Sequence, residues 1–200
     1  MKKTLVIATF NRHKLEEISA ILPGLPLELA ALADFSGAVP AEEDGATLEA
    51  NAAKKAVEAA AFCGRWALAD DTGLEVDALG GAPGVNSARY AGDGRSSADN
   101  CARLLRELAG VKGPARSARF ACVMALASPA GELRTARGVL EGRIAESPRG
   151  AGGFGYDPLF EELSSGLTLA GLGADKKNSL SHRALALRAI LPELQRLAAD

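Results

Sequence analysis

The chain has 200 residues, of which 48% are hydrophobic and 24% charged, and its formal net charge is −2 at pH 7. This length is enough for one domain with a substantial core, and the composition is that of an ordinary globular protein. A nucleic-acid-binding domain normally carries a basic excess to neutralise phosphates, so the acidic balance argues against a nucleic-acid partner. A small phosphorylated ligand stays possible, because a local cluster of Lys and Arg suffices for it.

The first elements expected are a strand and two helices. Residues 4–9, TLVIAT, form a short β-branched apolar run typical of a buried strand. Asn11 then stands where a helix N-cap is expected, ahead of apolar residues at helical spacing. Residues 38–46 are polar and acidic and indicate a loop, after which Thr47 is placed to cap a second helix.

The middle of the chain is expected to be mostly extended. Residues 65–70 predict a strand that ends at Asp70, with Thr72 and Gly73 turning the chain into an alternating segment over 74–79. Ser96 or Ser97 is placed to cap a third helix. Residues 118–127 and 132–142, joined by SPAG, predict a hairpin.

The last third combines a loop and a helix. Residues 147–158 form a Gly- and Pro-rich loop, and Ser181 is expected to start a final helix through Leu197. Helix-linked strands together with a hairpin indicate an α/β protein with a central mixed sheet flanked by helices, as a single domain over residues 1–200.

The cysteines and histidines narrow the compartment and the kind of metal. Cys63, Cys101 and Cys122 are far apart and odd in number, which favours a reduced cytoplasmic protein over a disulfide framework. With only His13 and His182 present, we expect a hard, carboxylate-bound metal, Mg²⁺ or Mn²⁺, in place of zinc. No apolar run suits a signal peptide or a membrane span, so we expect no membrane partner.

Two segments suggest a phosphate and a metal. ATFNRHK, residues 8–14, brings Arg12 and Lys14 to a helix start, where free N–H groups favour an anion. The alternative is a solvated basic patch. Asp70 and Asp71 lie side by side near a strand end, where α/β proteins place ligand groups, and neighbouring residues in extended chain point to opposite sides. A polar turn is the alternative for this pair, and a solvated loop is the alternative for the acidic residues that include Glu43.

Two later segments suggest a nucleoside. In the glycine-rich loop, Phe154 and Tyr156 could stack on a flat ring and Asp157 could accept hydrogen bonds from it. The alternative is a mobile surface loop. His182 and Arg183, at the start of the last helix, would offer two donors to an oxygen-rich ligand edge, with a structural histidine as the alternative.

In these segments the chain resembles the inosine triphosphate pyrophosphatase family, almost from end to end. The resemblance rests on five elements in the family's order: VIATFNRHKLEEI, EEDGATLEANAAKKA, ADDTGLEVDALGGAPGVNSARYAG, PRGAGGFGYDPLF and KNSLSHRALAL.

The resemblance implies a two-lobed α/β fold with a cleft between the lobes, a homodimer, and Mg²⁺-dependent hydrolysis of non-canonical purine nucleoside triphosphates to a monophosphate and pyrophosphate. It implies Glu43 and Asp71 as metal ligands, with Asp71 also the general base and Asp70 as support. The implied substrate-binding residues are Thr9, Phe10, Asn11, Arg12, His13, Lys14, Thr72, Phe154, Gly155, Tyr156, Asp157, Lys177, His182 and Arg183.

Four positions depart from the family's pattern. Phe10 replaces a small residue, Thr72 a serine, Asn86 an aromatic and Ala50 a glutamate. Thr72 keeps the hydroxyl, whereas Phe10 could narrow the phosphate loop and Ala50 removes one possible outer contact to the metal or water.

Other functions compete with this interpretation. A Maf-like pyrophosphatase acting on pyrimidine nucleotides would usually open with a Ser/Arg-rich loop. A non-hydrolytic nucleotide sensor would not need Glu43 together with Asp71. A structural protein would leave the cationic helix starts unexplained.

Overall fold

The computed structural model describes residues 2–22 and 24–199, and the chain forms two compact units. Unit 1 comprises Met1–Asp71, Cys122–Gly138 and Arg183–Asp200, and unit 2 comprises Thr72–Ala121 and Val139–His182. Each unit has a hydrophobic core of its own. No helix in the described ranges is both long and apolar enough to cross a membrane.

A mixed sheet provides strands to both units, as the sequence predicted. The strand order is β2-β1-β3-β5-β6-β7, with β4 paired to β3. β1 pairs in parallel with β2 and β3, whereas β3–β4 and β6–β7 are antiparallel. The strands are β1 (Lys3–Ile7), β2 (Leu27–Ala31), β3 (Trp66–Val76), β4 (Pro83–Gly84), β5 (Ser117–Ala127), β6 (Leu133–Ile144) and β7 (Phe160–Glu162).

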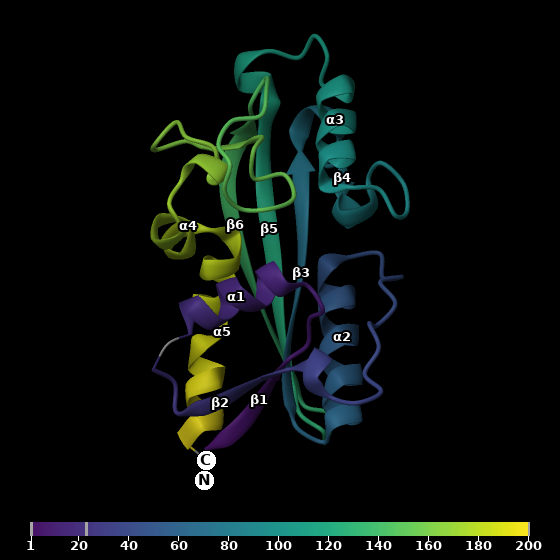
Figure 1. Ribbon diagram of the computed structural model, residues 1–200, viewed down its shortest axis with the longest axis vertical. Helices are drawn as coiled ribbons and strands as arrows, with labels where there is room; N and C mark the ends of the chain where they lie inside the picture. Colours follow the sequence, from purple (N-terminus) through teal and green to yellow (C-terminus); the bar gives the residue numbers. More distant parts are fainter. Residues whose placement is uncertain (1, 23, 200) are drawn as a thin grey trace. The chain divides into compact units, whose positions relative to one another are not determined.

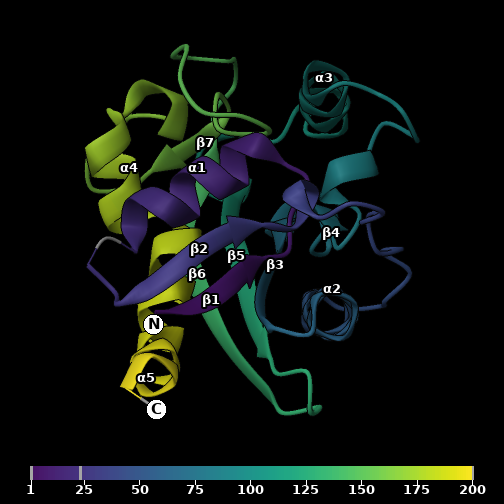
Figure 2. The same ribbon diagram turned by 60° about the horizontal axis from the view of Figure 1, so that its bottom comes forward.

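Three helices cover the strands of unit 1: α1 (Arg12–Ile21), α2 (Leu48–Cys63) and α5 (His182–Ala199). Alternate residues of β1 and β3, such as Leu5 and Leu68, pack in one cluster with Ile18 of α1 and Leu187 of α5. The helix α2 lies on the other side of these strands (Figures 1 and 2). The two faces of β3 therefore meet different helices.

Unit 2 packs α3 (Ser97–Glu107) and α4 (Ala174–Leu180) around its own cluster. Leu74, Leu104, Phe120 and Phe160 belong to that cluster, and all are buried. α3 lies beside β3 and β4, and α4 lies near β6 (Figure 1) and β7 (Figure 2).

The predicted helix starts are confirmed, because each depends on a local side-chain cap. Asn11, Thr47 and Ser96 each accept backbone N–H groups of the first turn, and Ser96 forms a capping box with Asp99. The hairpin is confirmed by the N–H of Ser128, which donates to the carbonyl of Glu132 between β5 and β6.

One predicted element boundary is wrong, and one helix was not predicted. β3 does not end at Asp70 but continues to Val76, so Thr72 and Gly73 lie within a strand and not in a turn. Pairing with neighbouring strands decides the conformation there, over the local turn signal. The sequence also missed α4, which ends where Ser181 adopts extended dihedral angles (φ −64°, ψ 157°) just before α5.

Candidate active site

The loop between β1 and α1 is held by its own side chains. Asn11 donates its N–H to Oγ1 of Thr9 at 3.1 Å, and its Oδ1 accepts the N–H groups of His13 and Lys14 at 3.0 and 3.3 Å. We expected these N–H groups to be available to an anion, and that expectation is wrong for two of them, because Asn11 already caps them. Binding of phosphate by the side chain of Lys14 stays a prediction.

Three other predicted residues of this loop point outward. The side chains of Arg12 and His13 are 88% and 62% exposed, and Nε of Arg12 pairs with Glu16 on the helix surface. Phe10 is also exposed, so its ring does not fill the interior of the loop. Of the predicted residues of this loop, Thr9 and Lys14 are partly buried, whereas Asn11 is exposed and acts as the helix cap.

Asp70 is enclosed by two cations of unit 1. Its Oδ2 lies 3.0 Å from Nζ of Lys14 and 3.0 Å from Nη2 of Arg183, and Nη1 of Arg183 also pairs with Glu17 of α1. Burial alone would raise the pKa of Asp70, but the charges of Lys14 and Arg183 outweigh burial and hold that pKa far below its usual range. Asp70 is therefore a permanent carboxylate that positions Lys14.

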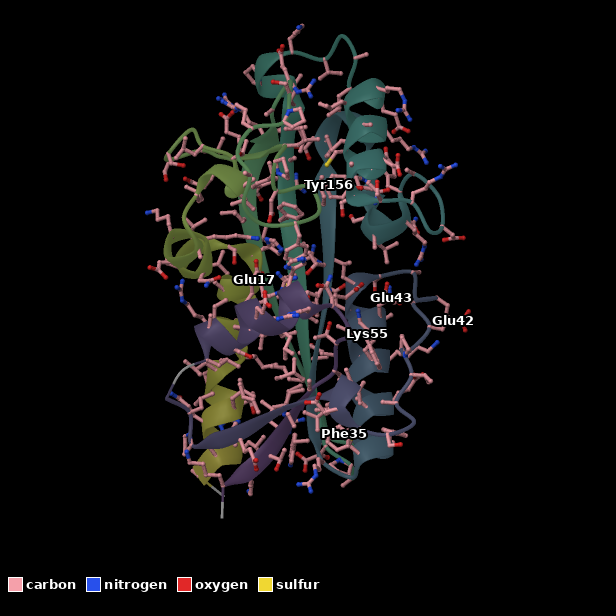
Figure 3. All side chains as sticks on the ribbon, in the orientation of Figure 1. Glu17, Phe35, Glu42, Glu43, Lys55 and Tyr156 are labelled. Carbon is pink, nitrogen blue, oxygen red and sulfur yellow. The ribbon has the colours of Figure 1, made fainter. Side chains whose placement is uncertain are left out.

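Asp71 points to the opposite face of β3, as extended chain requires. Its Oδ1 lies 2.8 Å from Nζ of Lys55, and its Oδ2 accepts Nδ2 of Asn51 at 3.2 Å, both from α2. Nζ of Lys55 also lies 2.8 Å from Oε1 of Glu43, and Figure 3 shows Glu43 and Lys55 close together. One ammonium group is thus shared by the two predicted metal ligands.

The environment of Asp71 differs chemically from that of Asp70. Burial raises the pKa of Asp71, and so does the negative charge of the neighbouring Glu43, whereas the positive charge of Lys55 lowers it. Burial is the largest effect, so the pKa of Asp71 lies above its usual value. A carboxylate with a raised pKa is a better general base than an ordinary aspartate. The two adjacent aspartates are therefore suited to different tasks.

The loop that carries Glu43 is attached to α2 by Asn51. Oδ1 of Asn51 accepts the N–H of Gly45 at 2.8 Å, and a Cβ at Gly45 would come within 2.5 Å of that oxygen. Nearby, Lys54 pairs with Asp44 at 2.7 Å. Asn51 thus orients both Asp71 and the Glu43 loop.

Sequence reasoning did not assign roles to Asn51 or Lys55. A usable signal was present, because the two residues are four apart in α2 and so lie on one face of the helix. Both follow the acidic segment within the same motif, EEDGATLEANAAKKA.

The oxygen set offered by Glu43 and Asp71 suits a divalent cation. Within the described ranges no group of three or more His, Cys, Asp or Glu side chains is arranged for a metal. Mg²⁺ commonly takes one or two protein carboxylates and completes its shell with water and substrate phosphates. Two carboxylates that already converge on one ammonium cation fit this type of site.

In unit 2, three predicted residues form a second group. Oδ2 of Asp157 pairs with Nζ of Lys177 and accepts the N–H of Phe154 at 2.8 Å. Nζ of Lys177 also lies 4.9 Å from the centre of the Phe154 ring. Asp157 and Lys177 are buried, so this pair fixes the conformation of the loop that carries Phe154 and Gly155.

Glycines allow this loop to pack closely. A Cβ at Gly153 would lie 2.1 Å from Oδ2 of Asp157, and a Cβ at Gly150 would lie 2.4 Å from the carbonyl carbon of Ala170. Both glycines have positive φ angles, which disfavour a side chain. The glycine signal in the sequence thus reflects close packing within the loop.

Two predicted nucleoside contacts have structural partners of their own. The ring of Tyr156 is buried and its hydroxyl donates to the carbonyl of Ser87 at 2.9 Å, so the expectation that this ring stacks on a base is not supported. His182 is buried with its ring stacked on Phe120, 4.5 Å between centroids. Phe154 is left as the aromatic residue of the loop with a partly exposed side chain.

The remaining predicted residues are Thr72 and Arg183. Thr72 is half-buried and follows Asp71 directly in β3. Arg183 belongs to unit 1, where its guanidinium is engaged by Asp70 and Glu17. The structure therefore gives Arg183 a role in holding Asp70, and the reading of a base edge by Arg183 stays a prediction.

The middle strand of the mixed sheet, β3, thus carries two adjacent aspartates in different surroundings, Asp70 between two cations and Asp71 beside Lys55 and Asn51. Comparison with known proteins supplies the family. Residues 5–193 match the Ham1 family. The chain belongs to the Ham1 family, and this confirms the inosine triphosphate pyrophosphatase resemblance seen in the sequence.

Relatives of established name cover nearly the whole chain. The dITP/XTP pyrophosphatase of Geobacter sulfurreducens is 54% identical over 183 residues, 92% of each chain. That of Desulforamulus reducens is 49% identical over 193 residues, 96% of each chain. Among solved structures, a HAM1 protein from Coxiella burnetii is 40% identical with a TM-score of 0.88, covering 97% of this chain and 99% of that one.

Proposed function

We propose that this chain hydrolyses non-canonical purine nucleoside triphosphates (ITP, dITP and XTP) to the nucleoside monophosphate and pyrophosphate, with Mg²⁺, in the cytoplasm. The chain is a pyrophosphatase of the Ham1 family, a hydrolase of acid anhydrides. The proposal of substrate is supported by relatives named dITP/XTP pyrophosphatase. A homodimer is part of the same proposal, and sedimentation of the purified protein would test it.

The observation that carries the mechanism is the chemical difference between Asp70 and Asp71. Asp70 stays ionised between Lys14 and Arg183, so it serves to position Lys14. Asp71 has a raised pKa and lies against Lys55 and Asn51. We assign Asp71 as the general base that accepts a proton from the attacking water.

Glu43 and Asp71 would hold Mg²⁺, which would offset phosphate charge and make water more acidic. Lys55 holds both carboxylates in place, and their charges, together with that of Asp70, raise its own pKa against the opposing effect of burial. Lys14, with the Thr9–Asn11 loop, would bind the charged oxygens of the leaving pyrophosphate.

The nucleoside would be bound by the unit 2 group. Phe154 would stack on the base, and the Asp157–Lys177 pair stabilises the conformation of the loop that carries Phe154. Hypoxanthine and xanthine carry an oxygen at position 6 that accepts a hydrogen bond, whereas adenine carries an amino group there. A donor of the protein, with His182 and Arg183 as the predicted ones, would therefore favour the first two bases, because a donor facing an amino group is left unpaired.

One assay tests this proposal directly. ITP, dITP, XTP, GTP and ATP are offered with and without Mg²⁺, and pyrophosphate and orthophosphate are measured separately. We expect pyrophosphate from the first three substrates, only with metal. Equal catalytic efficiency on all five would contradict the base selection, and orthophosphate as the first product would contradict the reaction.

The assignment of the base is tested by Asp71→Asn. The amide cannot accept the proton, so kcat should fall at least ~100-fold, the usual worth of a general base. Asp44→Asn is the matched control, because Asp44 is exposed and pairs with Lys54. A normal rate in D71N would show that another group accepts the proton.

A further inference from the structure

A pocket of about 410 Å³ lies in unit 2 and shares no residue with either group of the candidate active site. Three arginines and two glutamates contribute to its wall: Arg116, Arg143, Arg149, Glu146 and Glu161. Charged groups gathered on one concave surface can bind a ligand of opposite sign. The net charge of the wall therefore decides whether an anion or a cation would bind.

Arg116 is a buried cation of this wall without a carboxylate partner among the described residues. It is 5% exposed, and its guanidinium donates to the carbonyl oxygens of Leu108, Val111, Ile144 and Ala145. These acceptors satisfy its hydrogen bonds but leave its charge uncompensated. A buried charge of this kind is usually paired with an opposite charge.

The other two arginines are already arranged around a carboxylate. Glu161 is buried, and its two oxygens are bound by Arg143 through Nε (2.7 Å) and Nη2 and by Arg149 through Nη2. Arg143 and Arg149 are half-exposed, and in the described part of the chain their remaining N–H groups have no acceptor within hydrogen-bond distance. The two guanidiniums thus keep donors for an added oxyanion.

The remaining carboxylate does not neutralise the wall. Glu146 pairs with Nζ of Lys112 at 3.3 Å, on the exposed surface. With Glu161 shared between Arg143 and Arg149, the charge of Arg116 is in excess. The pocket is therefore positive, although the whole chain is acidic.

The backbone near Arg149 is fixed in place. Its N–H donates to the carbonyl of Pro158 at 2.9 Å, and its carbonyl accepts the hydroxyl of Thr168 at 2.7 Å. Only the side chain of Arg149 would have to adjust to transfer a hydrogen bond from Glu161 to a ligand. A fixed backbone with adjustable donors lowers the entropic cost of binding.

We propose that this pocket is a binding site for an inorganic phosphate anion, orthophosphate or pyrophosphate, held by Arg143 and Arg149 and attracted by Arg116. The wall contains no aromatic side chain, so it offers no stacking surface for a nucleobase. The volume is sufficient for pyrophosphate and its hydration water. The proposal is independent of catalysis by the Asp71 group.

The test is titration of metal-free protein, in chloride buffer with EDTA, by orthophosphate and by pyrophosphate. Heat is measured by calorimetry, and the site is located from ¹⁵N-resolved signals of the arginine Nε–H groups. We expect the signals of Arg143 and Arg149 to shift on binding. Tighter binding of pyrophosphate would identify the diphosphate as ligand, and equal affinity would identify the single phosphate group as the recognised unit. A shift confined to Arg12 would overturn the proposal, because it would place the anion at the predicted substrate loop.

Two variants move the affinity in opposite directions. Arg149→Gln should weaken binding at this site about tenfold, the usual effect of losing one charged hydrogen bond. Glu161→Gln should strengthen it by a similar factor, because a competing negative charge is removed while both arginines remain. Arg137→Gln, at the surface of unit 1, should change nothing. If E161Q leaves the affinity unchanged or weakens it, Glu161 and its arginines form a structural cluster only, and the proposal is wrong.

Discussion

The guanidinium of Arg183 donates from Nη2 to Oδ2 of Asp70 at 3.0 Å, and the two side chains are each only 1% exposed. The residues are 113 positions apart in the chain. This contact joins the start of α5 to the middle of β3 within unit 1. It also gives Asp70 a second cation besides Lys14, so Asp70 stays charged whether or not Lys14 turns toward a ligand.

Replacement of Arg183 should therefore destabilise the protein strongly. Arg183→Met leaves the buried carboxylate of Asp70 and the partly buried carboxylate of Glu17 without this partner, and breaking a buried ion pair costs about 3–5 kcal/mol. In a chain of this size each kcal/mol lowers Tm by roughly 2–4 °C, so Tm should fall by about 6–20 °C in a calorimetric scan. Arg196→Met, at an exposed pair with Glu193, is the control and should stay near the parent. A Tm within a degree or two of the parent for R183M would show that the buried pair contributes little.

Lys55→Gln should move the pH dependence of activity. The charge of Lys55 lowers the pKa of Asp71, so its removal raises that pKa further. The base must be deprotonated to act, and the acidic limb of kcat/KM should therefore shift to higher pH. The control is the neighbouring Lys54→Gln, which removes a positive charge that pairs with Asp44 and should leave the pH profile unchanged. If K55Q lowers kcat/KM equally at every pH and the acidic limb does not shift, the electrostatic role of Lys55 is contradicted.

The proposed role of Glu43 as a metal ligand can be tested with the neighbouring Glu42 as the control. Glu43 lies at the Lys55 ammonium, whereas Glu42 is exposed and points away in Figure 3. Glu43→Gln should raise the Mg²⁺ concentration needed for half-maximal activity by about tenfold or more, in line with the loss of a metal-site contact. Glu42→Gln should not. Equal Mg²⁺ titrations for the two variants would exclude Glu43 as a ligand.

Gly153→Ala should weaken nucleotide binding. The new Cβ would collide with Oδ2 of Asp157 and displace it from Lys177 and from the N–H of Phe154. We expect KM to rise roughly tenfold, the loss of about one charged hydrogen bond. Gly166→Ala separates the collision from backbone strain, since Gly166 has a similar φ angle and open space around it. Similar KM values for G153A and G166A would mean that strain alone explains the effect.

Local signals made part of the structure predictable. Asn11, Thr47 and Ser96 mark helix starts because an N-cap acts within three residues, and all three predictions are confirmed. The opposite orientations of Asp70 and Asp71 follow from the pleat of a strand in the same way. Which of the two aspartates is the metal ligand and base does not follow from spacing, and that assignment rests on the family resemblance.

The rest depends on contacts between distant parts of the chain. Thr72 and Gly73 carry a turn signal that strand pairing overrides, and Arg183 carries no local sign that it will reach Asp70. Asn11 is a second residue whose role was predicted only in part. Its role as cap was predicted, but not the consequence that it occupies two N–H groups expected to bind phosphate.

The opposed directions of Asp70 and Asp71 place a condition on the length of β3. An insertion or deletion of one residue between Trp66 and Ala69 would reverse every side chain that follows, and each aspartate would face the other's helices. Substitution of a small residue such as Ala67 preserves this alternation. The six residues from Trp66 to Asp71 should therefore accept changes of residue type far more readily than any change in their number.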